Sequence, residues 1–338
     1  MIDLGPSLMP QRFCYSETMR STLKRILGER NVARVRRALG KPQLVQGNPF
    51  VFPEFVLEIV SKVESDPGIT SRTDAIIALR NLGLDDFGTV LLSMPHPKFA
   101  KLSRLLPAMA SDDVQIRWTG TCGIPLLKQT LDFVRSAAYN YSSVTGRSLS
   151  DATILDFGCG YGRIARLMYY FVNETNFYGV DPWDTSIELC RTAGLSTNFH
   201  ISDYLPSDLP VGETRFDLMY AFSVFTHLSE RATLAALRTL RRYSAESSIL
   251  AVTIRPIEYW RQEKAVSAPE ANDLELKHRQ IGFAFRPHTR SPVDGDITYG
   301  DTSITLDWLS THCPEWTIQG IDRSLDDPSQ IYVFLTPA

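Results

Sequence analysis

Apolar residues recur along this chain with two different spacings, and the change between them divides the sequence. Over the first 110 residues they recur at three- and four-residue steps, which predicts helices. The expected helices are 17–39, 55–63, one capped by Thr70 or Ser71 that runs through Asn81, 98–109, and a long one over 125–144. From Thr153 onward, short apolar segments alternate with amphipathic ones. This alternation predicts a parallel sheet covered by helices on both faces.

The expected strands are 153–157, 176–180, 198–201, 216–222 and 248–254, with helices at 163–172, 185–193 and 230–243 between them. A long, irregular, aromatic-rich segment then runs to about Tyr299, followed by a helix over 303–312. Two last strands, 316–322 and 330–335, indicate a hairpin. We therefore expect a helical N-terminal region over residues 1–112 and an α/β domain over 113–338, with an insertion at about 256–302.

Composition agrees with a folded, water-soluble protein, since 43% of the residues are hydrophobic and 22% are charged. No apolar stretch approaches the roughly 20 residues that a membrane-spanning helix needs, and the first residues lack a secretory signal pattern. We expect a cytoplasmic protein. Its five cysteines are scattered and show no zinc-ligand spacing, so we expect reduced thiols and no metal.

Charge is uneven, because residues 1–50 hold nine basic and three acidic side chains although the whole chain has a net charge of −3. An acidic body argues against a protein that wraps nucleic acid. The basic face of helix 17–39 leaves three interpretations: exposure to solvent, contact with the anionic inner membrane surface, or binding of an anionic polymer or partner protein. The other N-terminal helices are expected to form a lid or a homodimer contact over the strand ends.

A glycine-rich turn, Gly158-Cys159-Gly160-Tyr161-Gly162, comes after the first predicted strand and begins a helix. Glycines there allow a tight turn and a close approach of backbone N–H groups to a ligand. Asp181 lies 19 residues after Gly162, at the end of the next strand, where a carboxylate can accept hydrogen bonds from a ribose diol. Asp203 ends the third strand and is placed to accept from an adenine amine. Together these positions predict an adenosyl site.

Asp156 and Arg163 flank the turn and indicate which adenosyl compound is bound. A carboxylate at this point suits an ammonium group better than a diphosphate, and backbone N–H groups at a helix start can bind a carboxylate. The spacing is also tighter than the G-x-G-x-x-G of dinucleotide sites. An amino acid joined to adenosine is S-adenosylmethionine.

The segment from Asp156 to Arg163 resembles the first motif of class I S-adenosylmethionine-dependent methyltransferases. Residues 178–182 resemble the second motif, 216–228 look like the motif of the fourth strand, and the likeness covers about 115–338. It implies an α/β fold with a seven-stranded, mostly parallel, doubly wound sheet in the order 3-2-1-4-5-7-6, strand 7 being antiparallel. Ala245-Glu246-Ser247 departs from the glycine-rich turn that precedes strand 5 in the family.

The resemblance also implies an enzyme that uses S-adenosylmethionine, releases S-adenosylhomocysteine and needs no metal. The residues that it places at the cofactor are Asp156, Gly158, Cys159, Gly160, Gly162, Arg163, Asp181, Pro182, Trp183, Asp203, Tyr204, Phe222 and Ser223.

Candidate catalytic groups are suggested by the need to align an acceptor with the methyl group and, for a hydroxyl, to remove a proton. His227 is the first candidate base, because histidine titrates near neutrality, although it also suits a helix start. His278 and His288 flank an apolar segment of the insertion, and Tyr299 could close over the substrate. The expected substrate residues are Trp118, Arg255, Glu258, Tyr259, Trp260 and Asp301. Asp301 could instead precede a helix that Thr302 or Ser303 caps.

The residues just after the fourth strand constrain the nature of the acceptor. Phe222-Ser223-Val224-Phe225 stands where methyltransferases acting on amino groups of DNA or glutamine have an Asn/Asp-Pro-Pro-aromatic tetrad, which favours an oxygen acceptor. The tail resembles methyltransferases of bacterial polysaccharide and secondary-metabolite pathways, so we expect O-methylation of a glycan or small molecule. The alternatives are an N-methyltransferase acting on a small molecule or protein, and a non-catalytic cofactor-binding module.

Overall fold

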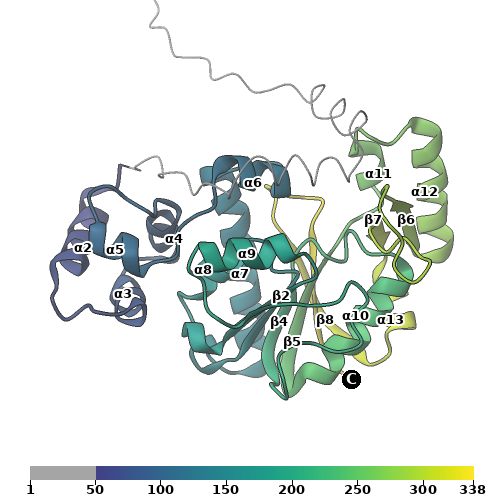
Figure 1. Cartoon of the computed structure of the whole chain (residues 1–338). Helices are drawn as coiled ribbons and strands as arrows, with labels where there is room; N and C mark the ends of the chain where they lie inside the picture. The colour runs from purple at the N-terminus through teal and green to yellow at the C-terminus, as the bar shows by residue number, and fades with distance from the viewer. Residues whose placement is uncertain (1–50) are drawn as a thin grey trace, which may run out of the picture. The chain divides into compact units, whose positions relative to one another are not determined.

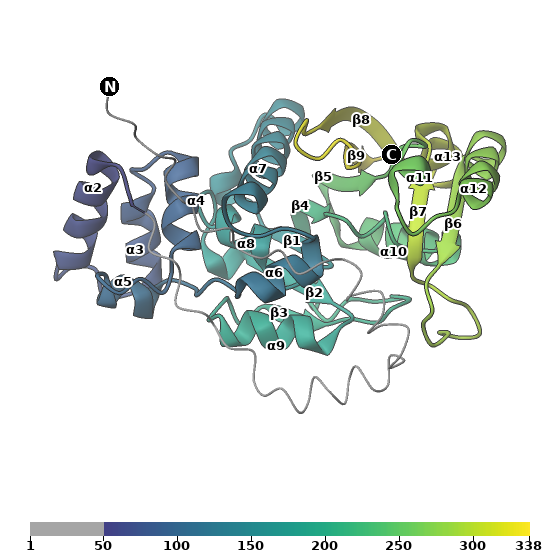
Figure 2. The same cartoon turned by 90° about the horizontal axis from the view of Figure 1, so that it is seen from above.

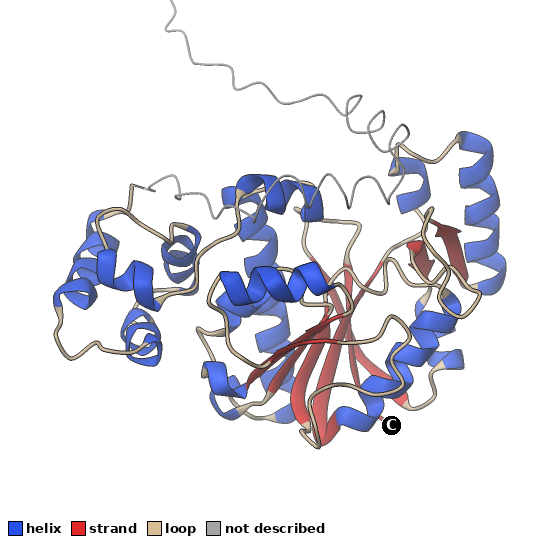
Figure 3. Ribbon diagram, in the orientation of Figure 1, coloured by secondary structure: helices blue, strands red, loops and turns tan. Residues whose placement is uncertain are grey.

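The computed structural model describes residues 51–338, which belong to one compact unit. The basic segment 17–39 lies outside the described residues, so its three interpretations stay open. Figure 1 and Figure 3 show a central sheet with helices packed on its two faces.

Seven strands form the central sheet in the order β3-β2-β1-β4-β5-β9-β8. Their bounds are β1 Ile154–Phe157, β2 Phe177–Asp181, β3 Phe199–Ile201, β4 Phe216–Ala221, β5 Ser244–Ile254, β8 Trp316–Arg323 and β9 Ile331–Pro337. The first five strands are parallel, whereas β9 runs antiparallel to both β5 and β8. The strand order predicted from the resemblance is confirmed, since β8 and β9 are the sixth and seventh strands of this sheet.

Alternate residues of the strands point to opposite faces of the sheet and belong to two separate cores. Ile154 and Tyr220 face the core shared with α7 (Gly123–Thr145), α8 (Arg163–Met168) and α9 (Asp184–Thr192). Leu155 and Met219 face the core shared with α10 (Glu230–Tyr243) and α13 (Leu306–His312). Because both faces are covered, the strands are apolar almost throughout.

Among the described residues, five helices precede α7: α2 Glu54–Ser65, α3 Arg72–Leu79, α4 Leu84–Leu92, α5 Ala100–Leu105 and α6 Asp112–Thr119. Ser71 caps α3 as expected, through a capping box with Asp74. The end of α3 contacts the C-terminal end of α8, where Arg80 donates hydrogen bonds to the carbonyls of Tyr169 and Val172. The sequence did not reveal α4 or α6 as separate helices, and the boundary near residue 112 stays a prediction.

The segment expected to be irregular, about 256–299, is largely ordered. It contains α11 Tyr259–Gln262, α12 Ala268–Ile281 and β6 Phe283–Pro287, and it leads into β7 Gly300–Ile304, which pairs antiparallel with β6. The expected helix start was therefore wrong, because residues 300–304 are drawn into this second sheet. Thr305, not Thr302 or Ser303, caps α13 and accepts a hydrogen bond from the backbone N–H of Trp308.

Candidate active site

The glycine turn after β1 has a backbone that only glycine adopts without strain. Gly158, Gly160 and Gly162 have φ angles of +79°, +54° and +73°. A Cβ on Gly158 would lie 2.4 Å from Cγ2 of Val224. The N–H groups of Gly158 and Cys159 donate to the carbonyl of Val180 over 2.8 and 3.1 Å, which fixes the turn to the end of β2.

Asp181 binds the turn from the end of β2. Its Oδ2 accepts from the N–H of Gly160, and its Oδ1 accepts from the N–H of Trp183, each over 2.9 Å. Burial raises the pKa of this carboxyl, and the two backbone donors oppose that rise. Each carboxylate oxygen can accept a second hydrogen bond, so the position remains suited to the predicted ribose contact.

Asp156 lies in β1, and its side chain is 2% exposed. Its Oδ2 accepts from the hydroxyl of Tyr220 over 3.1 Å. Burial raises the pKa of Asp156 to about 8, the charge of Asp181 adds to the rise, and Tyr220 and Arg163 oppose it. The carboxyl is therefore largely protonated at neutral pH, and a nearby cation would favour its ionisation.

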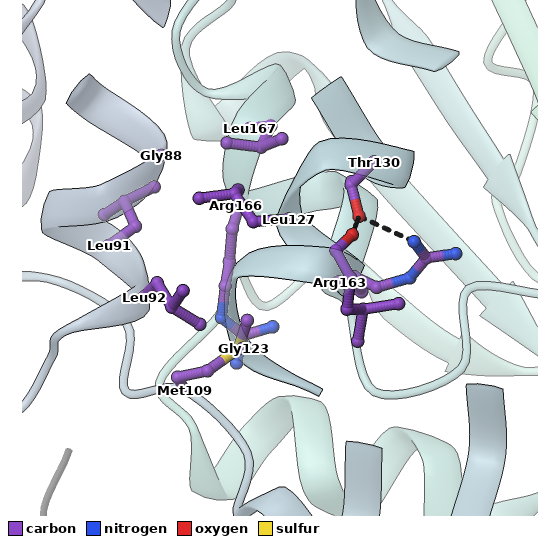
Figure 4. A pocket seen from close by; sticks show the side chains of 11 residues that line it. Gly88, Leu91, Leu92, Met109, Gly123, Leu127, Thr130, Arg163, Arg166 and Leu167 are labelled. Carbon is purple, nitrogen blue, oxygen red and sulfur yellow. Dashed lines mark hydrogen bonds between the residues drawn. The ribbon is translucent and has the colours of Figure 1, made fainter. Parts of the chain in front are cut away.

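Two arginines of α8 follow the turn, and Figure 4 shows both lining a pocket together with residues of α4 and α7. Arg163 donates to Oγ1 of Thr130 over 2.6 Å and to Oε1 of Gln129 over 2.8 Å, both on α7. Arg166 is 1% exposed and donates to three carbonyls, those of Tyr161, Gly162 and Ala108. Arg166 thus joins the glycine turn to the segment between α5 and α6.

Two tryptophans lie beside the turn, Trp118 and Trp183. Figure 2 shows α6, the helix that carries Trp118, near β1 and β2. The rings of Trp118 and Trp183 stack with centroids 4.7 Å apart and planes 12° apart. A Cβ on Gly160 would lie 3.5 Å from the ring of Trp118. Trp118, expected at the substrate, lies against the turn, and its contact with a substrate stays a prediction. Asp203 and Tyr204 are exposed after β3.

The loop between β8 and β9 also reaches this edge, which the sequence did not predict. Gln330 donates to Oγ of Ser223 over 3.1 Å, and Asp327 accepts from Gln129 over 2.5 Å. Ser223 has a φ of +59°, and its N–H donates to Thr253 over 2.7 Å. Phe222 lies under the guanidinium of Arg163, which is 5.0 Å from its ring centroid. In sequence, 324–330 looks like an ordinary hairpin turn, so no local signal marks it.

A second polar cluster gathers on Asp301 of β7. Its Oδ1 accepts from Arg255 and from the hydroxyl of Tyr259, each over 2.9 Å, and its Oδ2 pairs with Nε2 of His288 over 2.8 Å. Arg286 lies 3.7 Å from the same Oδ2. Burial acts to raise the pKa of Asp301, but the His288 hydrogen bond and the Arg255 charge outweigh it and hold the pKa below its usual range.

Backbone hydrogen bonds fix this cluster to the ends of β4 and β5. The N–H groups of Gly300 and Thr302 donate to the carbonyls of His227 and Thr226, and the N–H of Ile304 donates to the carbonyl of Arg255. The cluster therefore lies where open α/β sheets bind their ligands, beyond the carboxyl ends of the strands.

Both ring nitrogens of His227 are engaged. Nδ1 lies 2.7 Å from the carbonyl of Gly300, so it carries the proton and donates, and Nε2 lies 3.2 Å from Nη2 of Arg255, which donates to it. Burial and the charge of Arg255 lower the pKa of His227 to about 3. His227 is thus a neutral positioning group in this arrangement, and its predicted role as base gains no support from the geometry.

The remaining candidates divide between two networks. His278 and Trp260 both bind the hydroxyl of Ser303 over 2.8 Å and form no hydrogen bond or ion pair with Asp301 in the described part of the chain, and Glu258 is exposed. Tyr299 stacks on His227 with centroids 5.0 Å apart. Tyr299 also forms a β-bridge with Leu228, in the segment after β4 whose Val224 packs on Gly158, and burial raises the pKa of its hydroxyl.

Residues 154–246 match the model of a family described as a methyltransferase domain. A search of the curated proteins finds no match. With the strand order and the glycine turn, this match shows that the chain contains a class I S-adenosylmethionine-dependent methyltransferase domain.

Several solved structures are similar in outline. An S-adenosylmethionine-dependent methyltransferase from Clostridium acetobutylicum ATCC 824 is 10% identical, with a TM-score of 0.44, over 67% of this chain and 96% of its own. Magnesium protoporphyrin IX methyltransferase from Synechocystis PCC 6803 is 12% identical, with a TM-score of 0.43, over 67% and 90%. A glycopeptide N-methyltransferase bound to sinefungin is 10% identical, with a TM-score of 0.40, over 60% and 92%.

Within residues 51–338, no three His, Cys, Asp or Glu side chains are grouped so that they could hold a metal ion. In the same part of the chain, every helix is too short or too polar to cross a membrane.

Proposed function

We propose that the chain transfers a methyl group from S-adenosylmethionine to a hydroxyl oxygen of a glycan or small molecule. The observation that carries this proposal is that the segment after β4 contacts both regions: Val224 packs on Gly158, and the carbonyls of Thr226 and His227 accept hydrogen bonds from β7, the strand that carries Asp301. A carboxylate, two arginines and two histidines there offer the hydrogen-bonding groups that a polyhydroxylated acceptor needs. The sulfonium supplies an already activated methyl group, so the protein has to bind the acceptor, align its hydroxyl with the methyl group and remove the hydroxyl proton.

The described residues fit the cofactor in three places. Asp181 has acceptor capacity left for the ribose hydroxyls, beside the glycine turn. Asp156 is a buried carboxyl that an ammonium group would ionise. Gln330 carries a buried Oε1 that has no hydrogen-bond partner among the described residues, which suits a donor from a ligand.

Two residues near the strand ends bear on the nature of the acceptor, Ser223 after β4 and Tyr299 before β7. The segment after β4, which includes Ser223, lacks the proline-rich tetrad of methyltransferases that act on amino groups. The hydroxyl of Ser223 accepts a hydrogen bond from Gln330. Tyr299 and Arg255 line the Asp301 side, where a hydroxyl-bearing ring would be oriented by hydrogen bonds. A cytoplasmic location, a homodimer, and contact of segment 17–39 with a membrane surface or partner remain predictions.

The test is transfer of tritium from S-[methyl-³H]adenosylmethionine to a panel of methyl glycosides, each paired with its amino-sugar counterpart, and to simple phenols. We expect labelled products whose fragmentation spectra place the methyl group on oxygen. Methylation of the amino nitrogen alone would replace the proposal with an N-methyltransferase. Tight binding of S-adenosylhomocysteine without transfer to any acceptor would favour the non-catalytic module.

A further inference from the structure

His288 differs from His227, the other histidine of the cluster, because one of its two ring nitrogens has no hydrogen-bond partner among the described residues. Its Nε2 lies 2.8 Å from Oδ2 of Asp301, so Nε2 carries the proton and donates to the carboxylate. Nδ1 is left with its lone pair, and the structure gives it no partner among the described residues. The side chain is 36% exposed, whereas that of Asp301 is 8% exposed. A buried carboxylate thus orients an accessible imidazole.

The partners of Asp301 keep this orientation fixed. Arg255 and Tyr259 hold its Oδ1, which leaves Oδ2 for His288. The backbone N–H of His288 also donates to the carbonyl of Tyr299 over 3.1 Å, which anchors the residue to the strand that carries Asp301. A base whose second nitrogen is bound to a carboxylate has a fixed tautomer, and the imidazolium formed by proton uptake is stabilised.

The location of His288 fits a role at the acceptor. Its ring packs edge-on against Tyr299, with centroids 5.6 Å apart, and Tyr299 forms a β-bridge with Leu228, in the segment after β4 whose Val224 packs on Gly158. His227, by contrast, stacks on the face of the same tyrosine with both nitrogens occupied. The two histidines therefore share one aromatic neighbour but differ in whether a proton can be accepted.

We propose that His288, oriented by Asp301, is the general base that deprotonates the acceptor hydroxyl, and that His227 positions Arg255. The inference rests on the proposed function. The acceptor's O–H proton passes to Nδ1 of His288, an oxygen lone pair forms the new bond to the methyl carbon, and the carbon–sulfur bond breaks with its electron pair going to sulfur. The products are the methyl ether, S-adenosylhomocysteine and an imidazolium that returns its proton to solvent.

The first arm of the test needs no acceptor. Nitrogen-15 correlation spectra of the full chain, with the His288 signals assigned by their loss in His288→Gln, report which ring nitrogen carries the proton. We expect the Nε2–H tautomer with a bare Nδ1, and loss of that preference in Asp301→Asn. An Nδ1–H tautomer, or no change in Asp301→Asn, would overturn the dyad whether or not transfer is observed.

The second arm uses the acceptor found with the glycoside panel. His288→Gln keeps a donor toward Asp301 but removes the base, so kcat should fall by about 100-fold or more, while S-adenosylhomocysteine affinity stays unchanged. The exposed His312, on α13, provides the matched control His312→Gln, which should keep wild-type kcat. Full kcat in His288→Gln would refute the inference, whereas absence of transfer by the wild type would refute the proposed function instead.

The pH profile separates catalysis from a merely structural role. The titratable and charged groups facing His288 are Asp301, Arg286, His227 and Tyr299, with Arg255 acting through Asp301 and Arg290 through Tyr299. Removing the carboxylate in Asp301→Asn destabilises the imidazolium, so the rising limb of kcat against pH should move to lower pH. An unchanged limb in this variant, with wild-type kcat, would contradict the assignment.

Discussion

The glycine turn and the Asp301 cluster lie at the same edge of the sheet but depend on different interactions. The turn is held by backbone hydrogen bonds to Val180 and Asp181, with three glycines at positive φ. The Asp301 cluster is held by side chains from β5, α11, β6 and β7. In the first region the chain's conformation makes the site, whereas in the second the site exists only once the insertion has folded onto the sheet.

The largest effects should come from exchanging one glycine in each region. Gly158→Ala forces a Cβ to 2.4 Å from Val224 at a φ of +79°, so we expect a loss of about 1–3 kcal/mol in S-adenosylhomocysteine binding by calorimetry. Gly300→Ala forces a Cβ to 2.1 Å from the carbonyl oxygen of Arg286, which would separate β6 from β7. We expect this variant to lose acceptor methylation and keep cofactor affinity.

Gly83→Ala is the control for both, because Gly83 has a φ of −65° and nothing lies within 4 Å of its added Cβ. Equal loss of cofactor binding in Gly158→Ala and Gly300→Ala would show that the two regions are not separable.

This difference also explains how far the sequence could predict the molecule. The strands and the glycine turn are encoded in local patterns, whereas the order of the strands is predicted from the family resemblance. Asp181 binds the turn, and Asp156 lies in the strand before it. The Asp301 cluster depends on pairing of β6 with β7, which involves residues expected in an irregular segment and at a helix start. Gln330 could not be found either, because its position depends on where a hairpin packs.

The two regions should contribute with opposite signs to the dependence of the unfolding free energy on pH. The pKa of His227 is about 3 in the folded chain and about 6.5 when unfolded, so the unfolded chain binds more protons between these values. The resulting stability is fully present above about pH 6.5 and is lost as pH falls toward 3. The slope of the unfolding free energy against pH that one titrating group such as His227 can cause is at most about 1.4 kcal/mol per pH unit. Chemical denaturation of wild type and His227→Gln should show a shallower acid loss in the variant.

Asp156 should act in the other direction. Its pKa is raised to about 8 in the folded chain, so its contribution is present below the unfolded value of about 3.9 and is lost as pH rises toward 8. Asp156→Asn should therefore reduce the loss of unfolding free energy between pH 4 and 8. If His227→Gln and Asp156→Asn changed the slope of unfolding free energy against pH in the same direction, the assigned charge states would be contradicted.

The smallest expected effect is a proton released on cofactor binding. Asp156 is mostly protonated at pH 7, and an ammonium group beside it lowers its pKa, so binding should release a fraction of one proton. Calorimetry with S-adenosylhomocysteine in buffers of different ionisation enthalpy measures that fraction. Asp156→Asn should abolish it, and an unchanged release in the variant would place the ammonium group elsewhere.

Calorimetric titration of S-adenosylhomocysteine into the wild type and Asp181→Ala tests most directly whether the glycine turn is the adenosyl site. The account predicts tight binding to the wild type and a loss of about 1.5–3 kcal/mol in the variant, as for a charge-assisted hydrogen bond. Equal affinity of the two proteins would contradict it.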